Sequence, residues 1–293
     1  MTGPADRPPG RPAYRPPALQ IASLALHAGA VVALAAAPRH WRTIAGTLVA
    51  NHVALAAASL WPRGSLVGPN QLRLPDAAAR RGEVSLTFDD GPDPEVTPRV
   101  LDLLDAAGMQ ASFFVIGRRA RAHPRLVAEI ASRGHRVENH TETHPPLFAC
   151  YTAGLLRREI LPVQDLIAAA TGSPPRLFRA PAGLRNPLLD WVLHTAGLRY
   201  VSWTRRGFDA VESNPVAIAR RLLHGLAPGD ILLLHDGRAH GPRGAGGGNP
   251  VVLAALPPVL AALAGRGLRS VAIPGLSSEA SGPAPLLQAD SAG

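Results

Sequence analysis

Two short stretches decide how this chain is interpreted: Thr87-Phe88-Asp89-Asp90-Gly91-Pro92 and Asn139-His140-Thr141-Glu142-Thr143-His144. Histidines four residues apart project from one side of a helical turn, and one nearby aspartate completes a facial set of two imidazoles and a carboxylate. Such a set leaves metal positions open for water. Neighbouring residues at a strand end point in different directions, so one aspartate can bind a metal while the other acts as a base. The two stretches therefore predict metal-assisted hydrolysis.

From Glu83 onward, apolar bursts alternate with helical stretches. We expect strands at 84–88, 111–116, 135–139, 177–179, 199–203, 231–235 and 269–273. We expect helices at 97–107, 124–133, 152–170, 187–196, 215–225 and 251–264. Such alternation predicts a parallel sheet that right-handed crossovers wind into a sandwich or a barrel. The two stretches quoted above each lie at or just after the C-terminal end of a predicted strand, where barrel enzymes place catalytic residues.

Five motifs together resemble the polysaccharide deacetylase family, whose catalytic domain is named for NodB homology and which removes N-acetyl or O-acetyl groups from sugars. The motifs are 87–91 (TFDDG), 140–144 (HTETH), 179–183 (RAPAG), 203–209 (WTRRGFD) and 232–236 (LLLHD). Any one is weak alone, but five in family order are specific. The resemblance implies an α/β fold, a distorted (β/α) barrel of the NodB homology type with fewer than eight strand–helix units.

The resemblance also implies a metal site and an acid–base pair. Asp90, His140 and His144 would bind one divalent metal, with zinc expected and cobalt, nickel or iron also compatible with these N and O ligands. Asp89 would act as the general base that activates water. His235 would be the general acid that protonates the leaving amine.

Further residues would support these groups or contact the substrate. Arg179 would hold Asp89 in a charge-assisted pair, and Asp209 would keep His235 protonated near neutral pH. A backbone N–H of the third motif would stabilise the charge that develops on the acetyl oxygen. The expected substrate-binding residues are Pro181, Ala182, Gly183, Leu232, which would line the slot for the acetyl methyl, and Trp203.

The chain departs from the family pattern at three positions. In the fourth motif, Arg206 stands where the family often has an acid, and Ala210 where it often has a closing Trp. In the third motif, Ala182 stands where the family often has Tyr. A backbone donor at Ala182 would not need the Tyr side chain, so these changes bear on substrate preference more than on chemistry.

Composition excludes several classes of protein. The chain has 293 residues and is 46% hydrophobic, which is ample for a sizeable core and excludes disorder throughout. Its formal net charge of +9 comes entirely from arginine, and the arginines are scattered. Only 4% of the residues are aromatic, so we expect no nucleic-acid partner. Cys150 is the single cysteine and is expected to be inert.

Composition along the chain predicts five segments. They are a disordered Pro/Arg-rich arm at 1–17, one or two hydrophobic helices at 18–61, a linker at 62–82, the catalytic domain at 83–275 and a disordered tail at 276–293. Within the domain, the Gly-rich stretch 237–250 is expected to form a mobile loop beside the pocket.

The hydrophobic segment indicates membrane association, with three arrangements open. The apolar runs 18–37 and 44–61 could form two spans, a single anchor, or helices packed on the soluble domain. A signal peptide is disfavoured because the first run is long and a second follows. Arginines near the N-terminus favour a cytoplasmic start, so a hairpin would leave the domain on the cytoplasmic face of a bacterial inner membrane. A single span would place it on the other side.

The expected activity is removal of N-acetyl groups from an amino-sugar glycan, such as a chito-oligosaccharide, peptidoglycan or an exported polysaccharide. Three alternatives remain open: a deformylase or deacetylase of a lipid-linked amino sugar, an O-acetyl xylan esterase, and a non-catalytic sugar-binding membrane protein. No protein partner can be inferred. The non-catalytic alternative is disfavoured because no ligand, base or acid is missing from the motifs.

Overall fold

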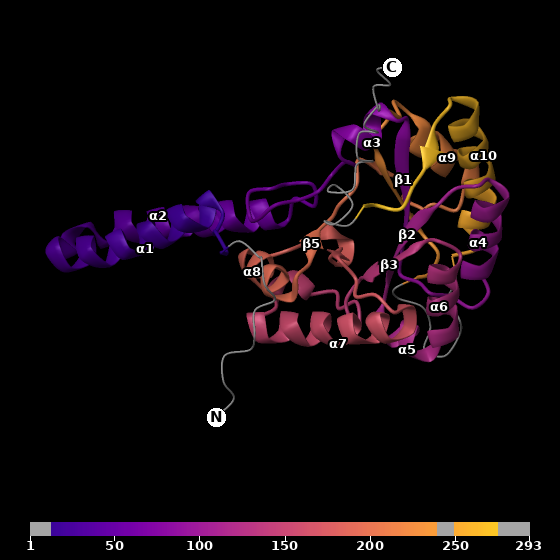
Figure 1. The fold of residues 1–293 in the computed structure, drawn as a ribbon. Coiled ribbons are helices and arrows are strands. Elements are labelled where there is room, and N and C mark those ends of the chain that lie inside the picture. Colours follow the sequence, from indigo (N-terminus) through magenta and orange to yellow (C-terminus); the bar gives the residue numbers. More distant parts are fainter. Residues whose placement is uncertain (1–12, 239–248, 275–293) are drawn as a thin grey trace, which may run out of the picture.

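A computed structural model describes residues 13–238 and 249–274. The arm expected at 1–17 lies mostly outside these residues, as do most of the expected loop at 237–250 and the expected tail at 276–293. The described chain forms a domain built around a curved parallel sheet and a helical hairpin that projects from it (Figure 1).

Among the described residues the sheet has eight strands, and every pairing between these strands is parallel. Its order is β5-β4-β3-β2-β1-β7-β6, with β8 paired to the start of β1. The strands are β1 (Glu83–Asp89), β2 (Ala111–Val115), β3 (Arg136–Asn139), β4 (Leu177–Phe178), β5 (Arg199–Tyr200), β6 (Arg205–Arg206), β7 (Ile231–His235) and β8 (Arg269–Ser270). This curled parallel sheet confirms the predicted fold class. β1 lies at its centre, and the Asp-Asp pair follows from that strand.

Helices connect the strands and cover the outside of the sheet (Figure 1). They are α3 (Asp76–Arg80), α4 (Thr97–Ala106), α5 (Gly117–Ala122), α6 (Pro124–Ser132), α7 (Ala153–Thr171), α8 (Pro187–Ala196), α9 (Pro215–Leu223) and α10 (Val251–Gly265), with short 3-10 turns at Phe148–Cys150 and Pro181–Gly183. The starts of α7, α8 and α9 have side-chain caps from Thr152, Asn186 and Asn214, which accept hydrogen bonds from first-turn amides. These local signals explain why most helix starts could be predicted.

Alternating residues of β7 face two different hydrophobic cores. Leu232 and Leu234 pack in the large core between the sheet and the outer helices. Ile231 and Leu233 belong to a smaller core on the inner face, which also contains Trp203. Because side chains alternate along a strand, the identity of the pocket-facing leucine depends on the register.

Residues 62–82, expected as a linker, are packed on the domain. Val67 and Leu74 are buried, and Gln71 and Arg73 form isolated bridges to Val201 and Asp230. The buried guanidinium of Arg185 donates hydrogen bonds to the carbonyl oxygens of Gly64, Gly68 and Pro69. The folded domain therefore begins before Glu83.

The two hydrophobic runs form α1 (Ala18–Ala36) and α2 (Trp41–Ser59), joined by a 3-10 turn at Pro38–His40. They pack on each other and extend away from the sheet (Figure 1). Ser23 is the one buried residue of α1, so the hairpin is not packed on the domain along its length. Its base is attached, because Gln20 Nε2 donates a hydrogen bond of 2.8 Å to the carbonyl of Pro187.

Among the described helices, α1 alone is both long and apolar enough to cross a membrane. Its 19 residues extend about 28 Å, close to the hydrocarbon thickness of about 30 Å. A signal sequence near an N-terminus satisfies the same criterion. The second run was expected to be a possible span, but α2 contains Asn51 and His52 and does not reach the required hydropathy.

Candidate active site

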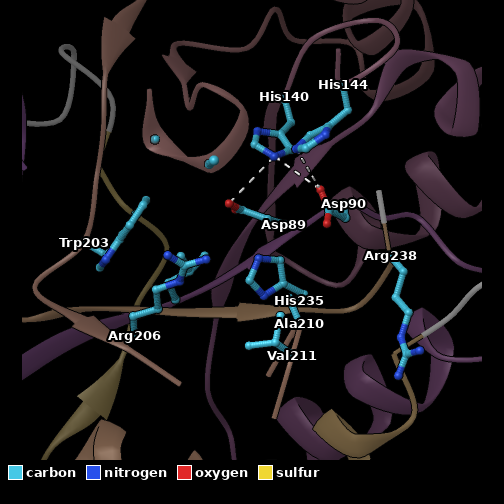
Figure 2. A pocket seen from close by; sticks show the side chains of 13 residues that line it. Asp89, Asp90, His140, His144, Trp203, Arg206, Ala210, Val211, His235 and Arg238 are labelled. Carbon is cyan, nitrogen blue, oxygen red and sulfur yellow. Dashed lines mark ion pairs between the residues drawn. The ribbon is translucent and has the colours of Figure 1, made fainter. Parts of the chain in front are cut away.

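The five motifs converge on one pocket at the C-terminal ends of the strands. The pocket has a volume of about 390 Å³ and is lined by Asp89, Asp90, His140, His144, Ala182, Gly183, Trp203, Arg206, Ala210, Val211, Leu233, His235 and Arg238. Figure 2 shows the two aspartates between the histidine pair and His235. Residues far apart in the sequence meet here because parallel strands end at the same edge of the sheet.

The ligand atoms of Asp90, His140 and His144 lie within 4.8 Å of one another. Asp90 Oδ1 is 3.4 Å from His140 Nε2 and 3.4 Å from His144 Nε2 (Figure 2). Two ligands bound about 2 Å from one tetrahedral metal lie about 3.3 Å apart. The residues therefore fit a divalent ion held by two imidazoles and one carboxylate.

The backbone of Arg179 orients His140 for this role. His140 Nδ1 is 2.8 Å from the Arg179 carbonyl oxygen, which requires the ring to donate its Nδ1 proton. The other ring nitrogen, Nε2, then faces Asp90 and His144. Metal-binding histidines are commonly fixed in this way, through a carbonyl bound to the other ring nitrogen.

The histidine pair comes from a loop, which corrects the expected helical turn. Residues 140–144 follow β3 without forming a helix, and Thr141 and His144 adopt left-handed backbone angles, with φ of 68° and 55°. Thr141 N–H donates to Asn139 Oδ1, and Thr141 Oγ1 accepts from His144 N–H. Thr141 thus fixes the turn through local hydrogen bonds. Glu142 points elsewhere and pairs with Arg121 at 3.1 Å.

Left-handed backbone gathers in the motifs. Among the described residues, all five non-glycine residues with positive φ lie in them: Asp90, Thr141, His144, Ala182 and Phe208. This conformation costs about 1–2 kcal/mol for a residue with a side chain. Such strain is typical of functional sites, where the surrounding structure holds side chains in one direction.

A buried ion pair fixes Asp89. Arg179 Nη1 lies 2.6 Å from Asp89 Oδ1 and also donates to Thr87 Oγ1 at 2.9 Å. Arg179 Nε and Nη2 donate to the carbonyl oxygens of Val201 and Ser202. Because each nitrogen of this buried cation has a partner, Asp89 is held rigidly with its Oδ2 3.8 Å from His140 Nε2.

His235 has a carboxylate partner on the side away from the pocket. Its Nδ1 is 2.9 Å from Asp209 Oδ1, and its backbone N–H donates to Asp209 Oδ2 at 2.7 Å. Asn249 is fully buried and donates to Asp209 Oδ2 and to the His235 carbonyl oxygen. The imidazole is therefore oriented by two residues, of which the sequence predicted only Asp209.

Opposing effects act on the pKa values of His235 and Asp90. Burial lowers the pKa of His235, but the charge and hydrogen bond of Asp209, with the charges of Asp90 and Asp89, raise it to about 9. Burial raises the pKa of Asp90, but the hydrogen bond from His140 and the neighbouring histidine charges hold it well below its usual value. At neutral pH the pocket thus contains a protonated His235 and an ionised Asp90.

Replacing Asp209 by Asn is expected to shift the alkaline limb of the kcat/KM profile to lower pH by about one unit or more. A general acid works only while protonated, so that limb follows the pKa of His235, which is about 9. A carboxylate partner favours the imidazolium, and its loss must lower that pKa. The measurement is a pH–rate profile for acetate release.

The control for this profile is Asp105→Asn, which removes the same charge from an exposed position on α4. Its alkaline limb should stay in place. If the Asp209→Asn limb also stays in place, Asp209 does not set the protonation of His235.

The structure separates the expected substrate-binding residues into two groups. Ala182, Gly183 and Trp203 line the pocket, as does Leu233. Leu232 is fully buried in the outer core, so the expectation for it is corrected by one residue: Leu233 is the leucine of β7 that faces the pocket. Pro181 is buried and is not among the lining residues.

Several residues of the site were not predicted. Asn249 lies outside the motifs, and Val211 and Arg238 line the pocket from positions next to them. Thr87, quoted with the first motif, proves to be a partner of Arg179. The alternation of β7 could have identified Leu233, but no spacing or periodicity in the sequence identifies Asn249.

Comparisons with known proteins agree with this geometry. A family profile described as polysaccharide deacetylase matches residues 76–201. The chain is 37% identical to a chitooligosaccharide deacetylase of Sinorhizobium fredii over 164 residues, covering 56% of this chain and 76% of that protein. It is 34% identical to a peptidoglycan-N-acetylglucosamine deacetylase of Bacillus cereus over 193 residues, which cover 65% of this chain and 85% of that protein. A crystal structure of a peptidoglycan N-acetylglucosamine deacetylase superposes on this chain with a TM-score of 0.63 at 29% identity. The superposition covers 70% of this chain and 91% of that chain.

Proposed function

Because this chain belongs to the polysaccharide deacetylase family, we propose that it is a metal-dependent hydrolase that removes N-acetyl groups from an amino-sugar glycan. One observation carries the proposal: a carboxylate, Asp89, and a protonated imidazole, His235, line the same pocket as the three-residue ligand set. Amide hydrolysis needs a base for water and an acid for the leaving nitrogen, and the pocket contains both.

Asp90, His140 and His144 would hold the divalent ion, with zinc expected and cobalt, nickel or iron compatible with the same donors. When bound, such an ion polarises a carbonyl and makes water a better nucleophile at neutral pH. The chain contributes the orientation of the three ligands, since the loop after β3 and the Arg179 carbonyl fix the imidazoles.

The acid–base steps belong to Asp89 and His235. Asp89 takes a proton from the attacking water, whose oxygen forms a bond to the acetyl carbon. His235 donates its Nε2 proton to the sugar nitrogen as the carbon–nitrogen bond breaks, which leaves acetate and a free amine. Arg179 keeps Asp89 in place for the first step, and Asp209 keeps His235 protonated for the second.

The remaining wall of the pocket suits an acetamido group. Ala182 adopts φ of 52°, and we assign its backbone N–H as the donor to the oxygen that becomes negatively charged. Leu233 offers an apolar surface for the acetyl methyl, and Trp203 offers a ring face to the sugar. Ala182 needs no larger side chain for this role because the donor belongs to the backbone.

A release assay tests the proposal. Purified protein, loaded with zinc or cobalt, is incubated with N-acetylglucosamine oligomers, peptidoglycan fragments and O-acetylated xylan, and acetate and formate are measured. We expect acetate from the N-acetylated sugars and none from an Asp89→Asn control. No acetate from any N-acetylated sugar, with metal content verified, contradicts the proposal, and formate from an N-formyl sugar favours the deformylase alternative.

A lipid-linked amino sugar is a second candidate substrate, favoured by the exposed apolar helix α1. This variant would use the same residues and the same chemistry, with the substrate presented at a membrane. We propose that the protein associates with a bacterial inner membrane, which the apolar helix α1 supports. Release from a lipid-linked sugar in vesicles, faster than from its soluble headgroup, supports this candidate over the soluble glycans.

A further inference from the structure

The β6 wall of the pocket carries a positive charge that the described protein does not neutralise. Within residues 13–238 and 249–274, the guanidinium of Arg206 forms no ion pair and no hydrogen bond, and its Nε is buried. Its neighbour on the strand, Arg205, pairs with Asp230 at 3.0 Å on the other side. Arg206 is half-buried, with its Nε shielded from water and without a protein partner among these residues, so a ligand that enters the pocket can supply the missing acceptor.

Two aromatic rings hold this guanidinium in place. Arg206 Cζ lies 5.4 Å from the ring centre of Trp203 and 4.8 Å from that of Phe208. Figure 2 shows Arg206 between Trp203 and His235, inside the pocket. Contacts with ring faces leave the N–H donors at the edge of the guanidinium able to bind an oxyanion in a forked geometry.

The charges elsewhere in the pocket favour an anion at this position. The lining carboxylates are Asp89 and Asp90. Asp89 is paired with Arg179, and Asp90 belongs to the metal-ligand set. Arg206 and Arg238 are the other charged lining residues besides the histidines, and both are cationic.

The same wall is open enough to admit a further group beside the acetamido sugar. Ala210 and Val211 line it, and Val211 is 86% exposed. Both side chains are small, so they leave room in this part of the pocket beside Arg206. An acetamido group at the ligand set and an anionic group at Arg206 can therefore belong to one substrate.

We propose that Arg206 binds an oxyanion of the substrate, a carboxylate or a phosphate on the acetylated sugar or on the adjoining unit. This inference rests on the proposed function and specifies its substrate class as an anionic amino-sugar glycan. A guanidinium suits both oxyanions because its parallel N–H donors match two oxygens. A neutral glycan would leave this charge without a partner.

The test compares kcat/KM for acetate release from three kinds of sugar. They are a neutral N-acetylglucosamine oligomer, an N-acetylglucosamine–N-acetylmuramic acid disaccharide with its carboxylate, and N-acetylglucosamine 1-phosphate. In Arg206→Gln, the ratio of the preferred anionic sugar to the neutral sugar should fall about tenfold, equivalent to about 1.4 kcal/mol. The ratio for Arg206→Lys should lie between those of wild type and Arg206→Gln, because lysine keeps the positive charge but lacks the two parallel N–H donors of arginine.

The comparison of the two anionic sugars shows whether Arg206 binds a carboxylate or a phosphate. The anionic sugar whose kcat/KM exceeds that of the neutral sugar in the wild type, but not in Arg206→Gln, carries the oxyanion that Arg206 binds. The matched control is Arg220→Gln, which removes the same charge from an exposed position on α9 and should leave the ratio unchanged. Raising the ionic strength should reduce the wild-type preference, because salt screens exposed charges.

Two outcomes separate this inference from the proposed function. If the wild-type protein releases acetate and Arg206→Gln keeps the wild-type ratio, the inference fails and the proposed function stands. If the metal-loaded wild type releases no acetate, the proposed function fails, and the affinities of the same sugars are measured by calorimetry. An equal affinity ratio in wild type and Arg206→Gln then overturns the role of Arg206 as well, with circular dichroism confirming that the variant is folded.

Discussion

Stripping the divalent metal from this protein is expected to abolish acetate release, and adding zinc or cobalt is expected to restore it. Without the ion, Asp89 must deprotonate ordinary water, whose pKa is far above neutral pH and which is therefore a poor nucleophile. The assay is acetate release before dialysis against a chelator, after it, and after readdition of metal. Elemental analysis follows metal content at each stage.

The spacing of the ligand atoms sets this expectation, because Asp90 Oδ1 lies 3.4 Å from both imidazole Nε2 atoms. Loss of activity should follow loss of one metal ion per chain. Magnesium should restore little, because it prefers oxygen ligands and octahedral geometry. Full activity in a preparation shown to be metal-free would refute the proposed mechanism.

The neighbouring aspartates should have separable effects. Asp89→Asn should retain metal and lower kcat by about a hundredfold to ten-thousandfold, since it removes the base. Asp90→Asn should lose metal affinity, and activity should recover partly at high metal concentration, since it removes a ligand. Metal titration by calorimetry and kcat for acetate release distinguish the two variants.

Glu142→Gln is the matched control for this pair. Glu142 lies between the two histidines in sequence, but its carboxylate pairs with Arg121, outside the ligand set. Its replacement should leave metal affinity unchanged. If Asp89→Asn loses metal and Asp90→Asn keeps it, the roles of base and ligand are exchanged, and mild effects in both would indicate a structural turn.

The sheet and most of the helices could be predicted because their signals are local. β7 is apolar over four consecutive residues, and β1 alternates between apolar and polar residues. The helix starts have caps such as Thr152 and Asn186. The missed elements have weaker signals. β6 consists of two arginines, and α3 and α5 have five and six residues, too short for a helical period to be recognised.

The sequence predicts which residues form the site better than it predicts how the backbone positions them. The positions of Asp89, Asp90 and His235 follow from strand ends, which apolar runs reveal. The backbone conformation of the histidine loop could not be predicted in this way. The left-handed angles at Thr141 and His144 depend on hydrogen bonds that the spacing of the histidines does not reveal. Asn249 reaches Asp209 across 40 residues, and single-sequence patterns carry no signal for such contacts.

The five residues with left-handed backbone angles affect the stability of this domain and its response to substitution. Together they oppose folding by about 5–10 kcal/mol, which is comparable to the whole net stability of an ordinary domain. The loops around the pocket should therefore open more readily than the strands beneath them, and their amides should exchange hydrogen first. A bound ion, which selects the closed form, should slow that exchange. Glycine at Ala182 or Phe208 would relieve the strain and raise the melting temperature. It would also loosen the backbone that aims the Ala182 N–H and places Phe208 against Arg206, so this protein is expected to trade thermal stability for activity at these positions.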